Sequence, residues 1–143
     1  MKWIDMPPVW LLGALVLARL GAGLGAVPRL PMSGAVFIAM GLGLIALAAW
    51  EFRRARTTII PRDAPSALIR TGIFAKTRNP IYLGDALILA GCALWWGSLP
   101  GLLLVPVFIW LINKRFIAGE EARLRDTFLA EFDAYAQQVR RWL

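Results

Sequence analysis

The sequence contains no histidine and a single cysteine, Cys92. Without histidine the chain cannot form a Ser-His-Asp triad, a Cys-His catalytic pair or the His-containing sites that bind zinc and iron. With one cysteine it cannot form a disulfide within the chain. Cys92 lies in an apolar run, where we expect a small core or lipid-facing residue. We therefore expect no metal and no chemistry that depends on histidine.

Charged residues are also scarce, at 17% of the chain, whereas 59% of the chain is hydrophobic and the mean hydropathy is +0.62. This composition is too apolar for a soluble domain of 143 residues. The charges gather in residues 51–80 and 114–143, which alternate with charge-poor stretches. The net charge of +7 is better explained by loops facing an anionic membrane leaflet than by nucleic-acid binding. We expect one integral membrane domain over residues 1–143 and no nucleic-acid partner.

Four apolar segments are candidate membrane spans. They cover about residues 7–27, 32–50, 80–97 and 101–113. The loop over residues 51–79 carries seven Lys or Arg residues against two acidic ones, which indicates the cytoplasmic side. Lys114 and Arg115 mark a second return to that side. We predict an all-α bundle of four transmembrane helices, with both termini in the cytoplasm, in the inner membrane of a bacterium.

Apolar residues recur along the tail at steps of three and four, the spacing of an amphipathic helix. They are Leu124, Phe128, Phe132, Tyr135, Val139 and Trp142. This pattern predicts one cytoplasmic helix over residues 117–142 that covers the end of the bundle. We expect this helix to form one wall of a site.

Polar and small residues inside the predicted spans add three expectations. Arg19 is interpreted as extending to the outer interface, or as contacting a lipid headgroup or a partner helix. Asp85 is a functional candidate because acids are rare at this depth, with pairing to Arg78 or Arg115 as the alternative. The glycines of the second span favour close helix packing, within one chain or between chains, so the oligomeric state stays open. They are Gly34, Gly41 and Gly43.

Two polar motifs interrupt the apolar pattern. The first, Arg70–Gly84, combines a Thr-Gly turn, an aromatic residue, a basic pair and an Asn-Pro helix entry. The second starts at Glu120-Glu121. Taken alone, the first can be a plain helix start and the second a solvated pair favoured by the helix dipole. The transmembrane hairpin between the motifs returns the chain to the same face, so we expect them to meet in one cytoplasmic pocket.

Together the motifs resemble the isoprenylcysteine carboxyl methyltransferase and phospholipid methyltransferase family of integral membrane enzymes. The resemblance covers about residues 50–143 and depends on Thr71-Gly72-Ile73-Phe74, Arg78-Asn79-Pro80-Ile81-Tyr82-Leu83-Gly84 and Glu120-Glu121-Ala122-Arg123-Leu124. It implies methyl transfer from S-adenosyl-L-methionine to a lipophilic acceptor in the membrane, either an isoprenoid-linked carboxylate or thiol or a lipid amine. The chain departs from the family pattern at Asn79, often His, at Phe74, often Tyr, and at Leu129-Ala130 with Phe132, in place of Gly-x and Tyr.

The resemblance and the chemistry of the side chains together suggest a set of site residues. The cofactor-binding candidates are Ser66, Ala67, Leu68, Ile69, Gly72, Phe74, Asn79, Tyr82, Glu120 and Glu121. The resemblance implies that the backbone of residues 66–69 reads the adenine. Aromatic rings can pack on adenine or face the sulfonium, Asn79 can donate to the cofactor carboxylate, and the glutamates can accept hydrogen bonds from the ribose or the ammonium.

The catalytic candidates are Arg115, Glu121 and Asp85. Arg115 is either a boundary charge that extends to the interface or a group that steers an anionic substrate. Glu121 or Asp85 can take a proton from an amine acceptor, whereas a carboxylate acceptor needs no base. The sequence does not identify the acceptor, nor whether its reacting atom is oxygen, sulfur or nitrogen.

Two other functions stay open. A membrane reductase of the sterol-reductase type would bind NADH or NADPH in the same place, although a pyrophosphate would call for more Arg and Lys than the acidic pair leaves there. A non-catalytic membrane adaptor would bind neither cofactor.

Overall fold

The computed structural model describes residues 6–24, 27–56 and 67–143. Within these ranges the chain forms helices and no strand, which confirms the predicted all-α class. The helices are α1 (Pro7–Leu20) with a 3-10 turn η1 (Gly21–Gly23), α2 (Pro31–Ala55), a 3-10 turn η2 (Gly72–Ala75), α3 (Pro80–Trp96), α4 (Leu99–Ile112), a π-helical segment η3 (Asn113–Ile117), α5 (Ala118–Phe128) and α6 (Ala130–Gln138).

Each of α1 to α4 begins with proline at one of its first two positions. Proline suits the first turn because its fixed φ is helical and its missing N–H would have no partner there. The start of α4 is also capped by Ser98, whose Oγ accepts from the backbone N–H of Gly101 at 3.1 Å and donates to the carbonyl of Ala18 at 2.7 Å. The predicted helix start at Pro80 is confirmed, because α3 begins at that residue.

Among the described residues, two helices are long and apolar enough to cross a membrane. They are α2 and the continuous helix Leu99–Phe128, which joins α4, η3 and α5. The segments Pro7–Gly23 and Pro80–Trp96 are shorter apolar helices. The predicted fourth span, residues 101–113, corresponds to α4, and the chain stays helical past Lys114 and Arg115. The residues that follow are mostly good helix formers, so a charged boundary does not end the helix.

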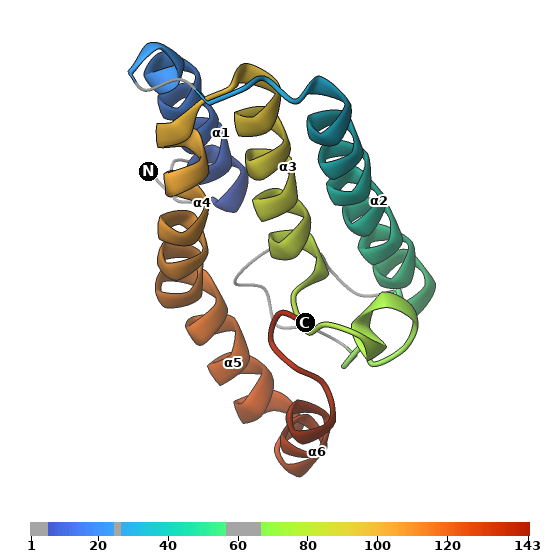
Figure 1. Ribbon diagram of the computed structural model, residues 1–143. Helices are drawn as coiled ribbons and strands as arrows, with labels where there is room; N and C mark the ends of the chain where they lie inside the picture. The colour runs from blue at the N-terminus through green and yellow to red at the C-terminus, as the bar shows by residue number, and fades with distance from the viewer. Residues whose placement is uncertain (1–5, 25–26, 57–66) are drawn as a thin grey trace.

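The prediction of one tail helix over residues 117–142 is wrong. The tail forms α5 and α6, which are separated at Leu129. Leu129 has φ 47°, a backbone conformation that L-residues rarely adopt. After α6 the chain extends from Val139 and ends beside the start of α3 (Figure 1). The apolar spacing continues across the break, so the spacing alone does not reveal it.

Helix α3 lies between α2 on one side and α1 with α4 on the other (Figure 1). Close approach of α2 and α3 depends on glycine: a Cβ atom at Gly41 would lie 2.5 Å from the carbonyl oxygen of Gly84. Gly34 and Gly91 form a second contact of this kind. In contrast, Gly43 has no described atom within 4 Å of its Cβ position, so it makes no close contact with the described residues of this chain, and packing between chains stays a prediction.

Apolar residues fill the interface of α1, α3 and α4. The buried set consists of Ala18, Tyr82, Ala86, Leu89, Phe108, Ile112, Phe116 and Ile117. A second, smaller cluster of Phe132, Tyr135 and Val139 joins α6 to Leu68 and Leu124. The second cluster, α5 and the C-terminus lie at the same end of the bundle as η2 (Figure 1). This arrangement brings the two motifs together.

The glycine contact gives a direct stability test. We expect Gly41→Ala to lower the free energy of unfolding in detergent by about 1–3 kcal/mol, because the added methyl group meets backbone. The matched variant Gly43→Ala should leave it unchanged or raise it by up to about 1 kcal/mol, because alanine is the better helix former. Denaturant unfolding followed by circular dichroism measures both. Equal effects of the two substitutions would show that the α2–α3 contact is not as close as described.

Candidate functional site

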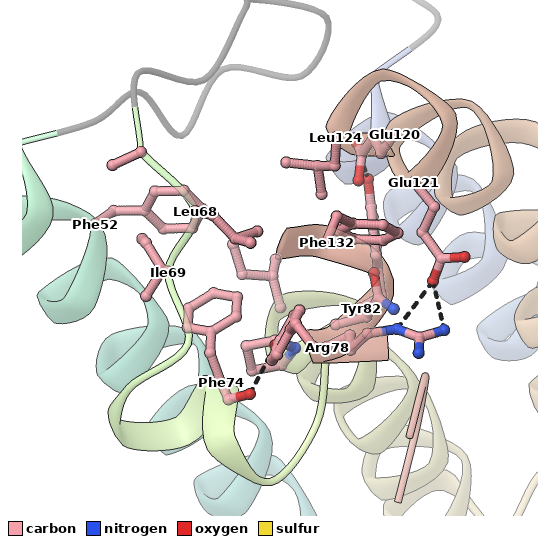
Figure 2. Close-up of a pocket in the computed structure, with 15 residues that line it drawn as sticks. Phe52, Leu68, Ile69, Phe74, Arg78, Tyr82, Glu120, Glu121, Leu124 and Phe132 are labelled. Atoms are coloured by element: carbon pink, nitrogen blue, oxygen red, sulfur yellow. Dashed lines mark hydrogen bonds and ion pairs between the residues drawn. The ribbon is translucent and has the colours of Figure 1, made fainter. Parts of the chain in front are cut away.

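A pocket lies between residues 67–82 and the α5–α6 pair (Figure 2). Its lining residues are Phe52, Ala67, Leu68, Ile69, Phe74, Arg78, Asn79, Pro80, Ile81, Tyr82, Glu120, Glu121, Leu124, Phe132 and Tyr135. The cavity volume is about 140 Å³, whereas pockets that bury a whole drug-sized ligand measure roughly 300–1,000 Å³. The described residues can therefore enclose only part of a ligand of that size.

The apolar walls of the pocket come from opposite sides. Figure 2 shows Phe52, Ile69 and Phe74 on one side and Leu124 with Phe132 across from them. The rings of Phe52 and Phe74 meet edge to face with their centroids 5.6 Å apart, a favourable geometry for aromatic pairs. The result is an apolar slot with aromatic edges.

A buried hydrogen bond joins the two sides of the pocket. The hydroxyl of Tyr135 donates to the carbonyl of Phe74 at 2.7 Å. Burial raises the pKa of Tyr135 to about 12, since an apolar surrounding disfavours the charged phenolate. The hydroxyl thus stays protonated at neutral pH and keeps this donor role.

The charged end of the pocket is organised by Glu121. Its Oε1 accepts from Arg78 Nε at 3.3 Å and from Arg78 Nη2 at 3.0 Å. It also accepts from Arg141, with Nε to Oε1 at 3.0 Å and Nη2 to Oε2 at 2.5 Å. The hydrogen bond that Arg141 donates to Glu121 raises the pKa of Arg141. One carboxylate therefore satisfies two guanidinium groups, and such charge-assisted bonds are the strong ones in proteins.

The loop before α3 also donates hydrogen bonds to backbone carbonyls of the C-terminal segment. Arg78 Nη1 donates to the carbonyls of Ala136 and Val139 at 2.8 and 2.9 Å, which satisfies free carbonyls at the end of α6. Two side chains of the loop reach the carbonyl of Arg141: Thr77 Oγ1 at 3.2 Å and Asn79 Nδ2 at 3.0 Å. The first motif and the tail thus form one unit.

Helices α3 and α5 contribute Tyr82 and Glu120 to the pocket. The Tyr82 hydroxyl donates to Glu120 Oε1 at 2.7 Å, and its ring stacks on Phe116 with the centroids 6.5 Å apart. Tyr82 is buried. This bond links α3 directly to α5, so the position of Glu120 depends on the packing of both helices.

The structure brings most of the expected cofactor-binding residues into one pocket. Those that line it are Ala67, Leu68, Ile69, Phe74, Asn79, Tyr82, Glu120 and Glu121. Ser66 lies outside the described residues. Gly72 does not line the pocket; it lies in the turn that carries Phe74. Asn79 uses one amide N–H on the carbonyl of Arg141 rather than leaving both free for a ligand.

The three catalytic candidates have different positions. Glu121 lines the pocket. Asp85 is buried one turn from Tyr82 on α3 and is not part of the lining; no hydrogen bond or ion pair from another described residue reaches it. Arg115 is exposed on η3 and does not line the pocket. The alternative that Asp85 pairs with Arg78 is wrong, because Arg78 pairs with Glu121.

Seven lining residues were absent from the predicted set. They are Phe52, Arg78, Pro80, Ile81, Leu124, Phe132 and Tyr135. Three of them belong to the apolar stripe of the tail, and three belong to the first motif, so the sequence contained a signal for each. Phe52 carried no such signal, because nothing local shows that the end of α2 reaches the loop.

The Glu121 cluster gives a stability prediction. We expect Glu121→Ala to lower the free energy of unfolding by about 2–3 kcal/mol, because it leaves a largely buried Arg78 without its carboxylate. Asp133→Ala is the matched control: it removes an ion pair with Arg125 whose side chains are each 51% exposed, which is worth about 0–1 kcal/mol. Chemical denaturation in detergent measures both values. A Glu121→Ala protein as stable as Asp133→Ala would contradict the role of the cluster.

Comparison with known proteins identifies the family. The phospholipid methyltransferase family matches residues 30–131. A stretch of 63 residues, 44% of this chain, is 44% identical to an uncharacterized protein of Haemophilus influenzae (strain Rd) and covers 100% of that protein. No solved structure matches the chain significantly. The family match includes the first motif and the start of the second, which meet in the pocket. The chain therefore belongs to the phospholipid methyltransferase family, which implies methyltransferase activity at a membrane.

Proposed function

We propose that the protein transfers a methyl group from S-adenosyl-L-methionine to a lipophilic acceptor held in the membrane. The observation that carries this proposal is the meeting of the two motifs in one pocket with both apolar and charged walls. Membership of a methyltransferase family supports the reaction type. The acceptor we propose is a lipid amine or an isoprenoid-linked carboxylate or thiol.

The apolar and polar groups of the pocket fit the parts of this cofactor. The apolar slot, which Phe52, Ile69 and Phe74 line on one side, suits a flat aromatic group such as adenine. Glu121 is already held by two arginines, so Glu120 is the carboxylate that we assign to the cationic part of the cofactor. One carboxylate oxygen of Glu120 accepts a hydrogen bond from the Tyr82 hydroxyl. The carboxylate can still accept further hydrogen bonds from a ligand. Asn79 keeps one amide N–H for the cofactor carboxylate.

The residues of the pocket act mainly by positioning. S-adenosylmethionine supplies the electrophilic methyl group when bound. Transfer of that group is a displacement that depends on alignment and on exclusion of water. The rings of Phe74 and Tyr82 can face a sulfonium, an interaction worth about 0.5–2 kcal/mol. Tyr82 is fixed for this role by its bond to Glu120 and its packing on Phe116.

The same charges disfavour the reductase alternative. A nicotinamide cofactor brings a pyrophosphate, which needs cationic or N–H partners. Arg78 is committed to Glu121 and to the carbonyls at the end of α6. Arg141 is also committed to Glu121. The described arginines of this pocket are thus occupied by other partners.

We also propose the membrane arrangement in which all four bundle helices cross the membrane as one domain. Helix α3 has 17 residues, so it is about 25 Å long against a hydrocarbon core of about 30 Å. Arg19 lies over the ring of Trp96 at 6.0 Å, a pairing suited to the interface opposite the pocket. The pocket then faces the cytoplasm, with both termini on that side, and we propose the inner membrane of a bacterium.

Asp85 and Arg115 complete the proposal on the acceptor side. Asp85 is buried one turn beyond Tyr82 along α3, so in the proposed arrangement it lies deeper in the membrane than the pocket. Burial of an acid at this depth marks a functional residue, and we propose that it takes the proton released by an amine acceptor. For Arg115, on η3 at the membrane boundary, we propose contact with an anionic headgroup. A carboxylate acceptor would need no base.

Cofactor binding tests the proposed function directly. In equilibrium dialysis, the purified protein in detergent should bind radiolabelled S-adenosylmethionine saturably and should not bind NADPH. Glu120→Gln is expected to weaken binding about tenfold, since loss of a charge-assisted hydrogen bond costs about 1.5 kcal/mol. Asp126→Asn, at an exposed position of α5, is the matched control and should bind normally. Binding that is not saturable, or that ignores Glu120→Gln, would refute the assignment.

The acceptor can be sought with the labelled methyl group. Membranes containing the protein are expected to transfer label from S-adenosylmethionine to the lipid fraction. If the acceptor is an amine, Asp85→Asn should lower the rate at least about tenfold while cofactor binding is kept, as expected for loss of general-base help. Asp126→Asn, at an exposed position of α5, controls for the loss of one acid. Label that enters only protein would contradict a lipid acceptor.

A further inference from the structure

Glu51 is a buried acid near the end of α2 that takes no part in the pocket lining. Only 8% of the residue is exposed. Its Oε2 accepts a hydrogen bond from Thr71 Oγ1 at 2.7 Å, across 20 positions of the sequence. Because a buried carboxylate is costly without a donor, this bond ties the end of α2 to the start of η2.

The carboxylate of Glu51 also lies against Gly72. A Cβ atom at Gly72 would collide with Oε1 and Cδ of Glu51, and Gly72 has φ +57°, which favours glycine. The Glu51 carboxylate therefore contacts the turn at two points, the backbone of Gly72 and the hydroxyl of Thr71. Two independent contacts fix where η2 lies relative to α2.

The turn held in this way carries an aromatic wall of the pocket. The backbone N–H of Phe74 donates to the carbonyl of Thr71 at 3.1 Å, so Phe74 follows the position of Thr71. The neighbour of Glu51, Phe52, places its ring 5.6 Å from the ring of Phe74. Glu51 and Phe52, consecutive residues of α2, thus contact the backbone of the turn and the side chain of Phe74.

We propose that Glu51 is a positioning residue of the cofactor site. By holding Thr71 and Gly72, it sets the position of the Phe74 ring in the pocket and couples α2 to that wall. The inference extends the proposed function, since the ligand is the cofactor proposed above. It assigns a role in binding to a residue that touches no ligand itself.

The test uses the full-length protein in detergent and radiolabelled S-adenosylmethionine in equilibrium dialysis. We expect Glu51→Ala and Thr71→Val each to raise the dissociation constant about tenfold, or about 1.4 kcal/mol. Glu51→Gln should stay within about twofold of the wild type, because its amide oxygen can accept the same bond. Thr127→Val is the control: it makes the same chemical change at an exposed threonine of α5. Unchanged binding by Glu51→Ala, or Glu51→Gln as weak as Glu51→Ala, would overturn the proposal.

Hydrogen exchange without cofactor separates this inference from the proposed function. The amides of Phe74, Lys76 and Thr77 are hydrogen-bonded within the turn, so Glu51→Ala should speed their exchange about tenfold or more, and Glu51→Gln should not. Absence of cofactor binding by the wild type would refute the proposed function, while the exchange rates would still test the anchoring. Unchanged exchange would overturn the anchoring. If Glu51→Ala does not fold, Thr71→Val compared with Thr71→Ser carries the same test.

Discussion

The site depends on one carboxylate, that of Glu121, which lies between the guanidinium groups of Arg78 and Arg141. The three residues come from the loop before α3, from α5 and from the C-terminal segment, so their contact brings three parts of the chain to one point. Further bonds, from Arg78 to the end of α6 and from Tyr135 to Phe74, join the same parts of the chain. Removing one partner of a largely buried charge cluster is costly. The cluster therefore organises the pocket, and we assign the cofactor to Glu120 beside it.

The helix bundle determines where the walls of the pocket can meet. Glycine contacts bring α2 close to α3, and α2 is long enough for Phe52 to reach the loop. On the other side, the chain leaves α3, reverses at Gly97 and returns through a continuous helix that carries Glu120 past the end of the core. The π-helical segment η3 lies in this helix between Ile112 and Ala118. Such segments often occur at functional sites, and this one directly precedes the turn of Glu120.

Much of this arrangement was predictable from the sequence, because the signals were local. The all-α class followed from hydropathy, and the meeting of the two motifs followed from the hairpin between them. The break at Leu129 was not predictable, because leucine is a good helix former and the apolar spacing continues through it. The cluster at Glu121 was equally hidden, since the loop offers several basic residues and only the fold selects Arg78. Glu51 was counted as a loop charge, because its partner Thr71 lies 20 positions away.

The central claim is that residues 67–82 and the α5–α6 pair form one cofactor site. Ultraviolet cross-linking of radiolabelled S-adenosylmethionine to the detergent-purified protein, followed by proteolysis and peptide mapping, tests it most directly. The account predicts label in peptides from these two segments or from the end of α2 that carries Phe52, with loss of label when unlabelled cofactor competes. Label in other peptides, or label that unlabelled cofactor does not displace, would contradict it.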